Sequence, residues 1–347
     1  MIKKVLFAGN YDKEYNRTKV ISVGLESLGI EIIHFVFKKH NNKTKSELLN
    51  LSKQVDIIFL PSFTHLDVKF VRKNITKPLI FDPLISKYLT KVFDFKQVSR
   101  YSPRAYKNYL KDKIAFKNSD IILADTEEHK KYFVEKFKIT PNKIKILRIG
   151  VNCKDFFIDN SIQKEEKFTV GFYGGFIPLQ GVQNILNAAK LLIDEKEIVF
   201  KLIGNGFEFE IAKNMVLKEN ISNVELLGWI DYKDLSNSIN KFDVCLGIFG
   251  DTPKADIVIP NKVYHYAACK KPIITKNTLA IKEVFEDEKN IILSSSEPED
   301  IAKSILKLKN DISLSEQISQ NAFSLICNDF DTKSIAKNFI KFAESII

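Results

Sequence analysis

The sequence predicts an α/β protein built from two doubly wound, Rossmann-like domains. First, its 347 residues are enough for two domains at roughly 100–200 residues each. Second, short strand-like runs alternate with amphipathic helical stretches, which is typical of a parallel sheet covered by helices on both faces. Third, this alternation stops once, in a polar and irregular stretch at residues 151–166, and then starts again.

Runs of β-branched and apolar residues predict the strands, and apolar residues at steps of three and four predict the helices. In the first half the strands are residues 4–8, 31–37, 56–60, 78–81, 121–124 and 145–147. The helices between them include residues 18–28, 44–52 and 126–137. In the second half the strands are residues 168–173, 199–203, 224–227, 244–249 and 273–275, and a helix covers residues 184–193.

The composition excludes several classes of protein. Apolar residues make up 45% and charged residues 28%, which is typical of a folded chain and not of a disordered or fibrous one. We expect no transmembrane helix, because no apolar run approaches roughly 18 residues. We also expect no secretory signal, because the opening Met1-Ile2-Lys3-Lys4 leads into only five apolar or small residues before Asn10. The wide spacing of the four cysteines argues against a disulfide framework and a structural metal site, which favours a cytoplasmic protein; they are Cys153, Cys245, Cys269 and Cys327.

Positive charge is confined to the first half. The net charge is +10, yet residues 1–160 hold 31 Lys or Arg against 17 Asp or Glu, and the remainder holds 22 against 26. A basic half attracts phosphates of a nucleic acid, an anionic lipid surface or a phosphorylated substrate. A merely solvated lysine-rich surface is the simpler interpretation.

A basic amphipathic helix is predicted to begin at Ser102-Pro103, a good N-cap and first-turn pair. Its basic residues share one face, and Tyr106, Leu110 and Ile114 share another. Such a helix suits an anionic membrane surface, although a purely structural helix is an equal alternative. No nucleic-acid-binding motif accompanies it. The basic residues expected at the membrane are Arg100, Arg104, Lys107 and Lys111.

Glycines cluster directly after predicted strands, where a turn or a close ligand contact favours them. None has the spacing of a dinucleotide fingerprint or a P-loop, which disfavours nicotinamide chemistry and P-loop phosphoryl transfer. Each alone is equally consistent with an ordinary turn. The glycines considered for a binding site are Gly9, Gly174, Gly175, Gly204 and Gly206.

Five segments of the second half resemble, in the same order, the nucleotide-binding domain of glycosyltransferases of the glycogen-synthase-like, retaining superfamily (glycosyl transferases group 1). Two shorter matches in the first half are Phe81-Asp82-Pro83 and residues 124–129. The five segments are Val170-Gly-Phe-Tyr-Gly-Gly-Phe-Ile-Pro-Leu-Gln-Gly-Val182, Phe200-Lys-Leu-Ile-Gly-Asn-Gly206, Val224-Glu-Leu-Leu-Gly-Trp-Ile230, Asp243-Val-Cys-Leu-Gly247 and residues 259–274.

This resemblance implies the GT-B architecture, with two Rossmann-like domains facing each other across a cleft. Residues 1–150 plus a returning C-terminal helix at 331–347 would bind the acceptor, residues 151–166 would be the linker, and residues 167–330 would bind the donor. The implied activity is retaining, metal-independent hexosyl transfer from a UDP- or GDP-sugar to a hydroxyl acceptor, with no bound cofactor. The basic half suggests a lipid-linked or membrane-presented acceptor at the inner, cytoplasmic face of the membrane, in envelope polysaccharide, glycolipid or glycan synthesis.

The key site can be argued from the residues themselves. Pro260 marks a helix N-terminus, which leaves the amides of Asn261, Lys262 and Val263 without intrahelical partners. Such amides and the helix dipole favour a diphosphate, and Lys262 and Lys254 would add positive charge. In the resembling family this helix start holds the donor diphosphate, and stabilising that leaving group is a large share of catalysis.

The sequence departs from the family pattern at four polar contacts. Ile257 and His265 stand where the family has two glutamates, with Asp256 beside the first. Gly175 and Gln180 stand where it has an Arg and a Lys on the diphosphate. Our hypothesis is that Lys254 and Lys262 neutralise the diphosphate and that His265 bonds the ribose.

In the first domain, Gly9-Asn10 and Arg17 are candidates for the diphosphate or acceptor. Asp82 falls where the family often has a residue near the transferred sugar, so we expect it to orient substrate. His129 is a weaker candidate, since a lone helical histidine is more often structural. In the second domain, Trp229 would stack on a nucleobase or pack in the core.

Two alternatives stay open besides the transferase. The missing glutamate pair fits a non-catalytic GT-B partner of an active enzyme, which would show no donor turnover. A sugar-nucleotide epimerase shares the fold and would release an isomerised sugar without an acceptor.

Overall fold

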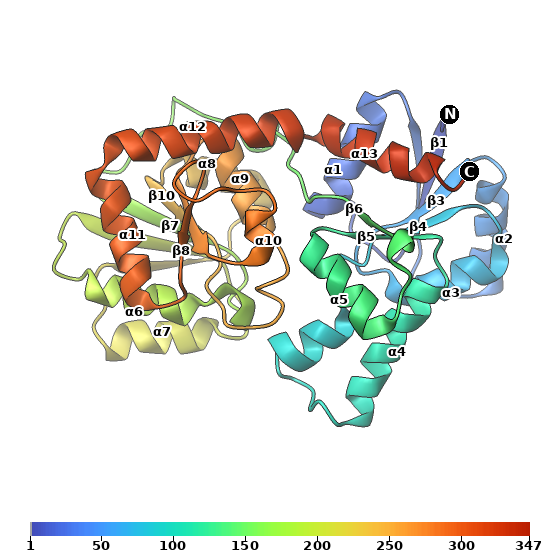
Figure 1. Cartoon of the computed structure of the whole chain (residues 1–347), viewed down its shortest axis with the longest axis horizontal. Coiled ribbons are helices and arrows are strands. Elements are labelled where there is room, and N and C mark those ends of the chain that lie inside the picture. The colour runs from blue at the N-terminus through green and yellow to red at the C-terminus, as the bar shows by residue number, and fades with distance from the viewer. Residues whose placement is uncertain (1) are drawn as a thin grey trace. The chain divides into compact units, whose positions relative to one another are not determined.

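The computed structural model describes residues 2–347, and the chain divides into two compact units (Figure 1). The first unit comprises residues 1–152 and 329–347, and the second comprises Cys153–Asn328. Each unit contains one parallel sheet of six strands. The α/β fold class with two doubly wound sheets, predicted from the alternation of strands and helices, is confirmed.

The first sheet has the strand order β2-β1-β3-β4-β5-β6, so the chain starts inside the sheet and winds outward in both directions. Its strands are β1 (Lys4–Gly9), β2 (Glu31–Val36), β3 (Ile57–Leu60), β4 (Leu79–Phe81), β5 (Ile121–Ala124) and β6 (Ile144–Ile146). Its helices are α1 (Asn16–Ser27), α2 (Asn42–Ser52), α3 (His65–Asn74), α4 (Pro103–Lys117), α5 (Glu127–Phe137) and α13 (Thr332–Glu344), with a π-helix at Leu89–Asp94 and a 3₁₀ turn at Pro141–Lys143.

Side chains of alternate strand positions pack on opposite faces of this sheet, as the two-residue repeat of a strand requires. Phe7 and Phe59 pack under α1 and α13, whereas Leu6 and Ile58 pack under α2 to α5. Helix α13 therefore belongs to the first unit although it is last in the sequence, and it lies beside α1 (Figure 1). Its N-cap is Asp331, whose carboxylate accepts a hydrogen bond from the amide of Ser334.

The second sheet has the order β12-β11-β10-β7-β8-β9. Its strands are β7 (Phe168–Tyr173), β8 (Ile198–Ile203), β9 (Val224–Gly228), β10 (Val244–Leu246), β11 (Ile273–Lys276) and β12 (Ile292–Ser294). Its helices are α6 (Val182–Leu191), α7 (Phe209–Lys218), α8 (Tyr232–Asn240), α9 (Asn261–Ala268), α10 (Leu279–Lys282), α11 (Pro298–Asn310) and α12 (Ile312–Asp329), with a 3₁₀ turn at Pro178–Gln180. One face packs on α6 and α11 through residues such as Val170, Phe200, Ile185 and Ile305.

The basic helix α4 begins where the sequence places it, since the Ser102 hydroxyl accepts a hydrogen bond from the Ala105 amide. The buried face differs from the expected one, because it contains Ala105, Ala115 and Phe116, whereas Tyr106 is 62% exposed. Asp112 is also buried on this helix and accepts hydrogen bonds from the loop after β4, at the Ser86 hydroxyl and the amides of residues 87 and 88. Burial raises the pKa of Asp112 to about 6.

No helix among residues 2–347 combines the length and the apolar character needed to cross a bilayer.

Candidate functional site

Helix α9 starts directly after the loop that follows β10, at the edge of the second sheet where the parallel strands end. Pro260 occupies the N-cap position and cannot donate a backbone hydrogen bond. The amide of Val263 donates to the carbonyl of the N-cap residue Pro260 at 3.1 Å, so the expectation that this amide lacks an intrahelical partner is wrong. The amides of Asn261 and Lys262 precede it in the first turn, where an α-helix supplies no partner.

Lys262 is the central residue of this site. Its side chain is 3% exposed, and its ammonium donates to the Gln180 side-chain oxygen at 2.6 Å and to the Gly247 carbonyl at 3.3 Å. Nζ also lies 3.6 Å from the centroid of the Phe172 ring. Burial lowers the pKa of Lys262 well below its usual value, and no residue among 2–347 contributes a carboxylate partner. The side-chain nitrogen of Lys262 therefore has only neutral partners among the described residues.

The turn after β7 lies directly over this ammonium. A Cβ on Gly174 would meet Lys262 Nζ at 2.8 Å and the Gln180 side-chain oxygen at 3.2 Å. Gly175 has open space, since a Cβ there would meet nothing nearer than 3.8 Å. Gln180 stands at the position where the resembling family has a lysine, and Lys262 from α9 brings an ammonium to the same place.

The glycines after β8 have a different role from the one expected. Gly204 has a φ of +137°, and a Cβ there would lie 1.9 Å from the Gly174 carbonyl oxygen, so only glycine fits. A Cβ on Gly206 would clash with the Phe176 carbonyl at 2.5 Å. The amide of Phe176 also donates to the Asn205 carbonyl. These glycines let two loops pack on each other, and direct contact with a ligand is not needed to explain them.

A second cationic group lies beside the loop between β10 and α9. Lys276, at the end of β11, donates to the Gly250 carbonyl and contacts the carboxylates of Asp251 and Asp256, each at 3.1 Å. Asp256 is exposed and ion-paired. Lys254 is 8% exposed in the same loop, so both candidate lysines are buried.

His265 lies on the buried face of α9. Its side chain is buried, stacks on the Phe156 ring at 3.7 Å between centroids, and bonds the Tyr173 hydroxyl through Nδ1 at 2.6 Å. Burial lowers the pKa of His265 to about 3, so it is neutral at pH 7. These contacts give His265 a structural role between α9, Phe156 and Tyr173, and the predicted bond to a ribose stays a prediction. Trp229 is 73% exposed, which rules out the alternative of core packing.

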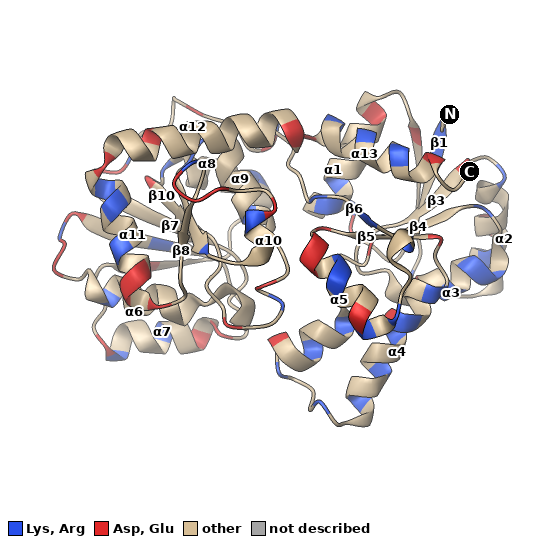
Figure 2. Cartoon of the chain, in the orientation of Figure 1, with Lys and Arg blue, Asp and Glu red and all other residues tan. Residues whose placement is uncertain are grey.

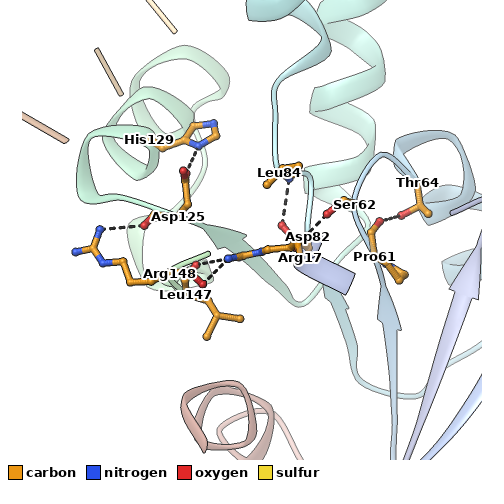
Figure 3. A network of polar contacts seen from close by, with 10 residues as sticks. All are labelled: Arg17, Pro61, Ser62, Thr64, Asp82, Leu84, Asp125, His129, Leu147 and Arg148. Atoms are coloured by element: carbon orange, nitrogen blue, oxygen red, sulfur yellow. Dashed lines mark hydrogen bonds and ion pairs between the residues drawn. The ribbon is translucent and has the colours of Figure 1, made fainter. Parts of the chain in front are cut away.

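In the first unit, the predicted site residues Arg17 and Asp82 form a buried ion pair (Figure 3). Arg17 Nε donates to Asp82 Oδ2 at 2.8 Å, and its NH1 group donates to the carbonyls of Leu147 and Arg148 at 2.8 and 2.6 Å. Asp82 Oδ1 accepts from the Leu84 amide. Both side chains are 1% exposed. Each side chain is enclosed and bonded to the other, which explains both residues structurally, and the predicted contacts of Arg17 with a ligand and of Asp82 with a sugar stay predictions.

His129 belongs to the same network through its neighbours (Figure 3). Its Nδ1 lies 2.6 Å from Asp125 Oδ1, and Arg148 donates to the Asp125 carbonyl at 2.9 Å. His129 Nε2 is buried and has no hydrogen-bond partner among residues 2–347. The structure thus brings His129, Arg17 and Asp82 to the strand ends of β4, β5 and β6.

Gly9 and Asn10 end β1, on another part of the same edge. Gly9 has a φ of +126°, and the Asn10 amide donates to Asp67 Oδ2 at 2.9 Å. Asp67 also accepts from His40 Nε2 at 2.7 Å. The Asn10 side chain is exposed and stays a candidate for contact with a substrate.

Basic side chains are abundant on α4 (Figure 2). Arg100, Arg104 and Lys107 are exposed, Lys111 is half-buried, and the Arg100 guanidinium lies over the Tyr101 ring. Tyr101 is 88% exposed, so cationic and aromatic side chains share this surface.

Comparison with known proteins identifies the second unit. Residues 154–325 match the family described as "Glycosyl transferases group 1". Over these residues the chain is similar to group 1 glycosyltransferases. The matched part contains Lys262, Gln180 and the Gly174-Gly175 turn.

Two relatives from Methanocaldococcus jannaschii, both named uncharacterized glycosyltransferases, are 27% and 24% identical over 62% and 68% of this chain. The matched regions span 58% and 61% of those relatives, so this chain covers less than two thirds of their length. A probable glycosyltransferase from Pseudomonas aeruginosa is 30% identical over 108 residues, which are 30% of this chain and 25% of that protein.

Solved structures of the GT-B fold match the whole chain. HepE from Anabaena, in complex with UDP and glucose, has a TM-score of 0.76 at 14% identity and covers 99% of this chain and 100% of its own. Sucrose-phosphate synthase from Thermosynechococcus elongatus has a TM-score of 0.76 at 12% identity, with 99% of each chain covered. The fold of this chain is therefore GT-B.

Sequence reasoning missed several polar residues that shape these regions. The sequence does not show the contacts that these residues make, because their partners come from other elements or another turn of the chain. The residues are Lys276, which pairs with Asp256, Asp125, which bonds His129, and Asp112, which bonds Ser86. The sequence feature that could have indicated Lys276 is a lysine at the end of the uncharged strand Ile273–Lys276. A half-buried charge in that position usually has a charged partner.

Proposed function

We propose that this protein is a retaining, metal-independent hexosyltransferase that moves a sugar from a nucleoside diphosphate sugar to a hydroxyl acceptor. The group 1 domain and the names of its relatives support a glycosyltransferase. HepE, of the same fold, was solved with UDP and with UDP-glucose, which supports a UDP-sugar ahead of a GDP-sugar. The donor would bind in the second unit and the acceptor in the first.

One observation carries this proposal: the Lys262 ammonium is buried beneath the Gly174-Gly175 turn without a carboxylate partner among residues 2–347. A buried unpaired charge is unfavourable, and an anion placed beside it recovers that free energy. The adjacent N-terminus of α9 favours the same kind of ligand through its amides and dipole. Both features suit a diphosphate.

The chemistry follows from these groups. As the bond from the sugar to the diphosphate breaks, negative charge grows on the leaving oxygen, and the amides of α9 and the Lys262 ammonium stabilise it. Lys254 would add a second cation from the preceding loop. Asp256, held by Lys276, would contact the donor sugar. The leaving phosphate oxygen would accept the proton of the acceptor hydroxyl, so no protein base is required.

A thermal-shift experiment with UDP, GDP and their sugars tests the donor site. A ligand at 100 times its Kd adds about 2.7 kcal/mol to the free energy of unfolding, so we expect a clear rise in Tm with one nucleotide. Lys262→Met should remove this rise. Lys271→Met is the matched control, because Lys271 is also buried and donates to the Asn240 carbonyl. It lies just before β11, at the amino ends of the strands, whereas α9 begins at their carboxyl ends. An unchanged nucleotide shift in Lys262→Met would overturn the assignment.

Donor turnover separates the transferase from its rivals. A transferase releases UDP or GDP from the bound sugar nucleotide, slowly to water and faster with an acceptor. An epimerase keeps the diphosphate bond and yields an isomerised sugar nucleotide. A non-catalytic partner yields neither product, and NMR of the product anomer tests retention.

The acceptor, in this proposal, is lipid-linked or presented by a membrane, at the cytoplasmic face. The exposed cations and tyrosines of α4 and of the segment just before it support this, since such surfaces bind anionic headgroups through charge and ring insertion; the tyrosines are Tyr101 and Tyr106. Each basic side chain near an anionic surface contributes about 1 kcal/mol.

Vesicle sedimentation tests this surface. Replacing Arg104, Lys107 and Lys111 with Gln should weaken binding to phosphatidylglycerol vesicles by about tenfold or more. The charge-matched control replaces Lys190, Lys196 and Lys233, which are exposed in the second unit, and should bind as the wild type does. Equal binding of the two triple variants to the vesicles would contradict membrane contact through α4 and would favour a purely structural helix.

A further inference from the structure

Two cysteines meet at the place where the chain passes from one unit to the other. Cys153 is the first residue of the second unit, and Cys327 is the last but one. They are 174 residues apart in sequence, yet their Sγ atoms are 3.4 Å apart. Both side chains are half-buried, so small reagents can reach them.

The backbone around both thiols is held in place. Cys327 lies in the last turn of α12, and Cys153 follows Val151, whose amide donates to the Phe330 carbonyl at 3.0 Å. Val151 also forms a parallel bridge with Asp331. The two connecting segments therefore run side by side past the cysteines. Shortening the sulfur separation from 3.4 Å to the roughly 2.05 Å of a disulfide needs only a small side-chain movement.

We propose that Cys153 and Cys327 form a reversible disulfide that staples the two connecting segments together. With oxidised glutathione as the oxidant, one Cys thiolate attacks a glutathione sulfur and releases glutathione thiolate. The second Cys thiolate then displaces the remaining glutathione. The two cysteines lose two protons and two electrons in total, and one oxidised glutathione becomes two reduced molecules.

The third cysteine of this region is a poorer partner. Cys269 caps the C-terminal end of α9 and interacts electrostatically with Cys327, but burial raises its pKa to about 12. Its thiolate is therefore scarce at neutral pH, and the thiolate is the reactive form. Cys245 is fully buried in β10 and does not react with external reagents.

The disulfide would also be coupled to α9. Phe156, three residues after Cys153, stacks on His265 of that helix, and Asn240 of α8 holds the Phe157 carbonyl at 2.9 Å. A bond from Cys153 to Cys327 thus ties the end of α12 to the segment that packs on α8 and α9.

Thiol counting and peptide mapping test the proposal on the full-length protein. After incubation with oxidised glutathione and denaturation, we expect two titratable thiols in place of four, and four again after dithiothreitol. Non-reducing tryptic digestion should yield one cross-linked pair that joins the peptides of Cys153 and Cys327. Four thiols after oxidation, stable mixed disulfides with glutathione, or a link through Cys245 or Cys269 would overturn it.

Variants keep the test independent of folding defects. Cys153→Ser and Cys327→Ser should each retain the wild-type Tm under reducing conditions and should form no cross-link. Oxidation should raise the Tm of the wild type by about 5 °C, because the link closes a long loop in the unfolded chain, and should leave Cys153→Ser unchanged. An equal rise in Cys153→Ser would contradict the assignment. None of these readouts uses a donor or an acceptor, so they stand apart from the proposed function.

Discussion

Both units bury a basic side chain near the carboxyl ends of their parallel strands, Arg17 in the first unit and Lys262 in the second, and the partners of these two side chains differ. In the first unit, the Arg17 guanidinium meets the Asp82 carboxylate and two carbonyls. In the second, the side-chain nitrogen of Lys262 contacts an amide oxygen, a backbone carbonyl and the Phe172 ring, and no carboxylate among the described residues. The first arrangement supplies its own counter-ion, and the second lacks one.

The contrast separates a charge that the fold itself satisfies from one that, in our proposal, a ligand would satisfy. A buried pair that is fully hydrogen-bonded holds elements together, and Arg17 joins α1 to β4 and to the segment after β6. A buried charge without a counter-ion lowers stability, and such groups concentrate at functional sites. The difference predicts opposite effects of mutation in the two units.

The largest effect on the free energy of unfolding should come from breaking the buried ion pair of Arg17 and Asp82. Asp82→Ala leaves the Arg17 charge buried without its carboxylate, and we expect a loss of about 3–5 kcal/mol in the free energy of unfolding by urea denaturation. Replacing both residues, as Arg17→Met with Asp82→Leu, should lose less than Asp82→Ala alone. Glu31→Ala is the control in the same unit, since its ion pair with Lys4 is exposed and should contribute at most about 1 kcal/mol. If Asp82→Ala resembled this control, the pair would not be a structural joint.

A smaller effect of opposite sign is expected at Lys262. Replacing Lys262 with Met and Gln180 with Leu removes a buried charge together with its nearest polar partner, so no orphaned amide oxygen is left. We expect the free energy of unfolding without ligand to stay unchanged or to rise by roughly 1–2 kcal/mol, while nucleotide binding is lost. Urea denaturation with and without UDP measures both. A loss of several kcal/mol without ligand would place Lys262 with Arg17, as a residue that the fold itself needs.

Local pattern in the sequence was sufficient for the fold. The strand runs, the Ser102-Pro103 and Pro260 helix starts and the terminal helix depend on neighbours within a few residues, and all appear in the structure. Helix α4 shows the limit of this reasoning. Its Ala105 and Phe116 face packs into the core of the first unit, whereas Tyr106 is exposed, and local sequence does not determine which face packs. The short edge strand β12 lacked enough residues for a pattern.

The roles of site residues depended on contacts that sequence cannot show. Arg17 and Asp82 are 65 residues apart, and only the assembled sheet shows that each satisfies the other. His265 was assigned by its position in a family pattern, but helix α9 turns it toward Phe156. Lys262 was chosen for its charge, and the structure adds its burial and its bond to Gln180, the residue that stands in for the family's lysine.

The smallest expected effect is a pH dependence of nucleotide affinity. We expect it from Lys262, which has no carboxylate partner among the described residues, and not from the Arg17–Asp82 pair. Burial lowers the pKa of Lys262 in the free protein, so above that lowered pKa the amine is neutral. A bound diphosphate favours the charged form and raises the pKa, so binding takes up a proton. Affinity should therefore rise as pH falls through the range between the lowered pKa of Lys262 in the free protein and its higher pKa in the complex, by up to about tenfold per pH unit.

Lys262 also makes the free energy of unfolding of the ligand-free protein depend on pH, because its pKa differs between the native and the unfolded state. Because the native state holds Lys262 less protonated than the unfolded chain does, stability from this residue rises with pH up to the unfolded pKa of about 10.4. Calorimetric titration of UDP in buffers of different ionisation enthalpy measures the proton uptake, and Lys262→Met should abolish it while Lys271→Met retains it. Binding of UDP without proton uptake by the wild type would mean that Lys262 stays neutral in the complex, and the positive charge on the diphosphate would then have to come from Lys254 and the amides of α9.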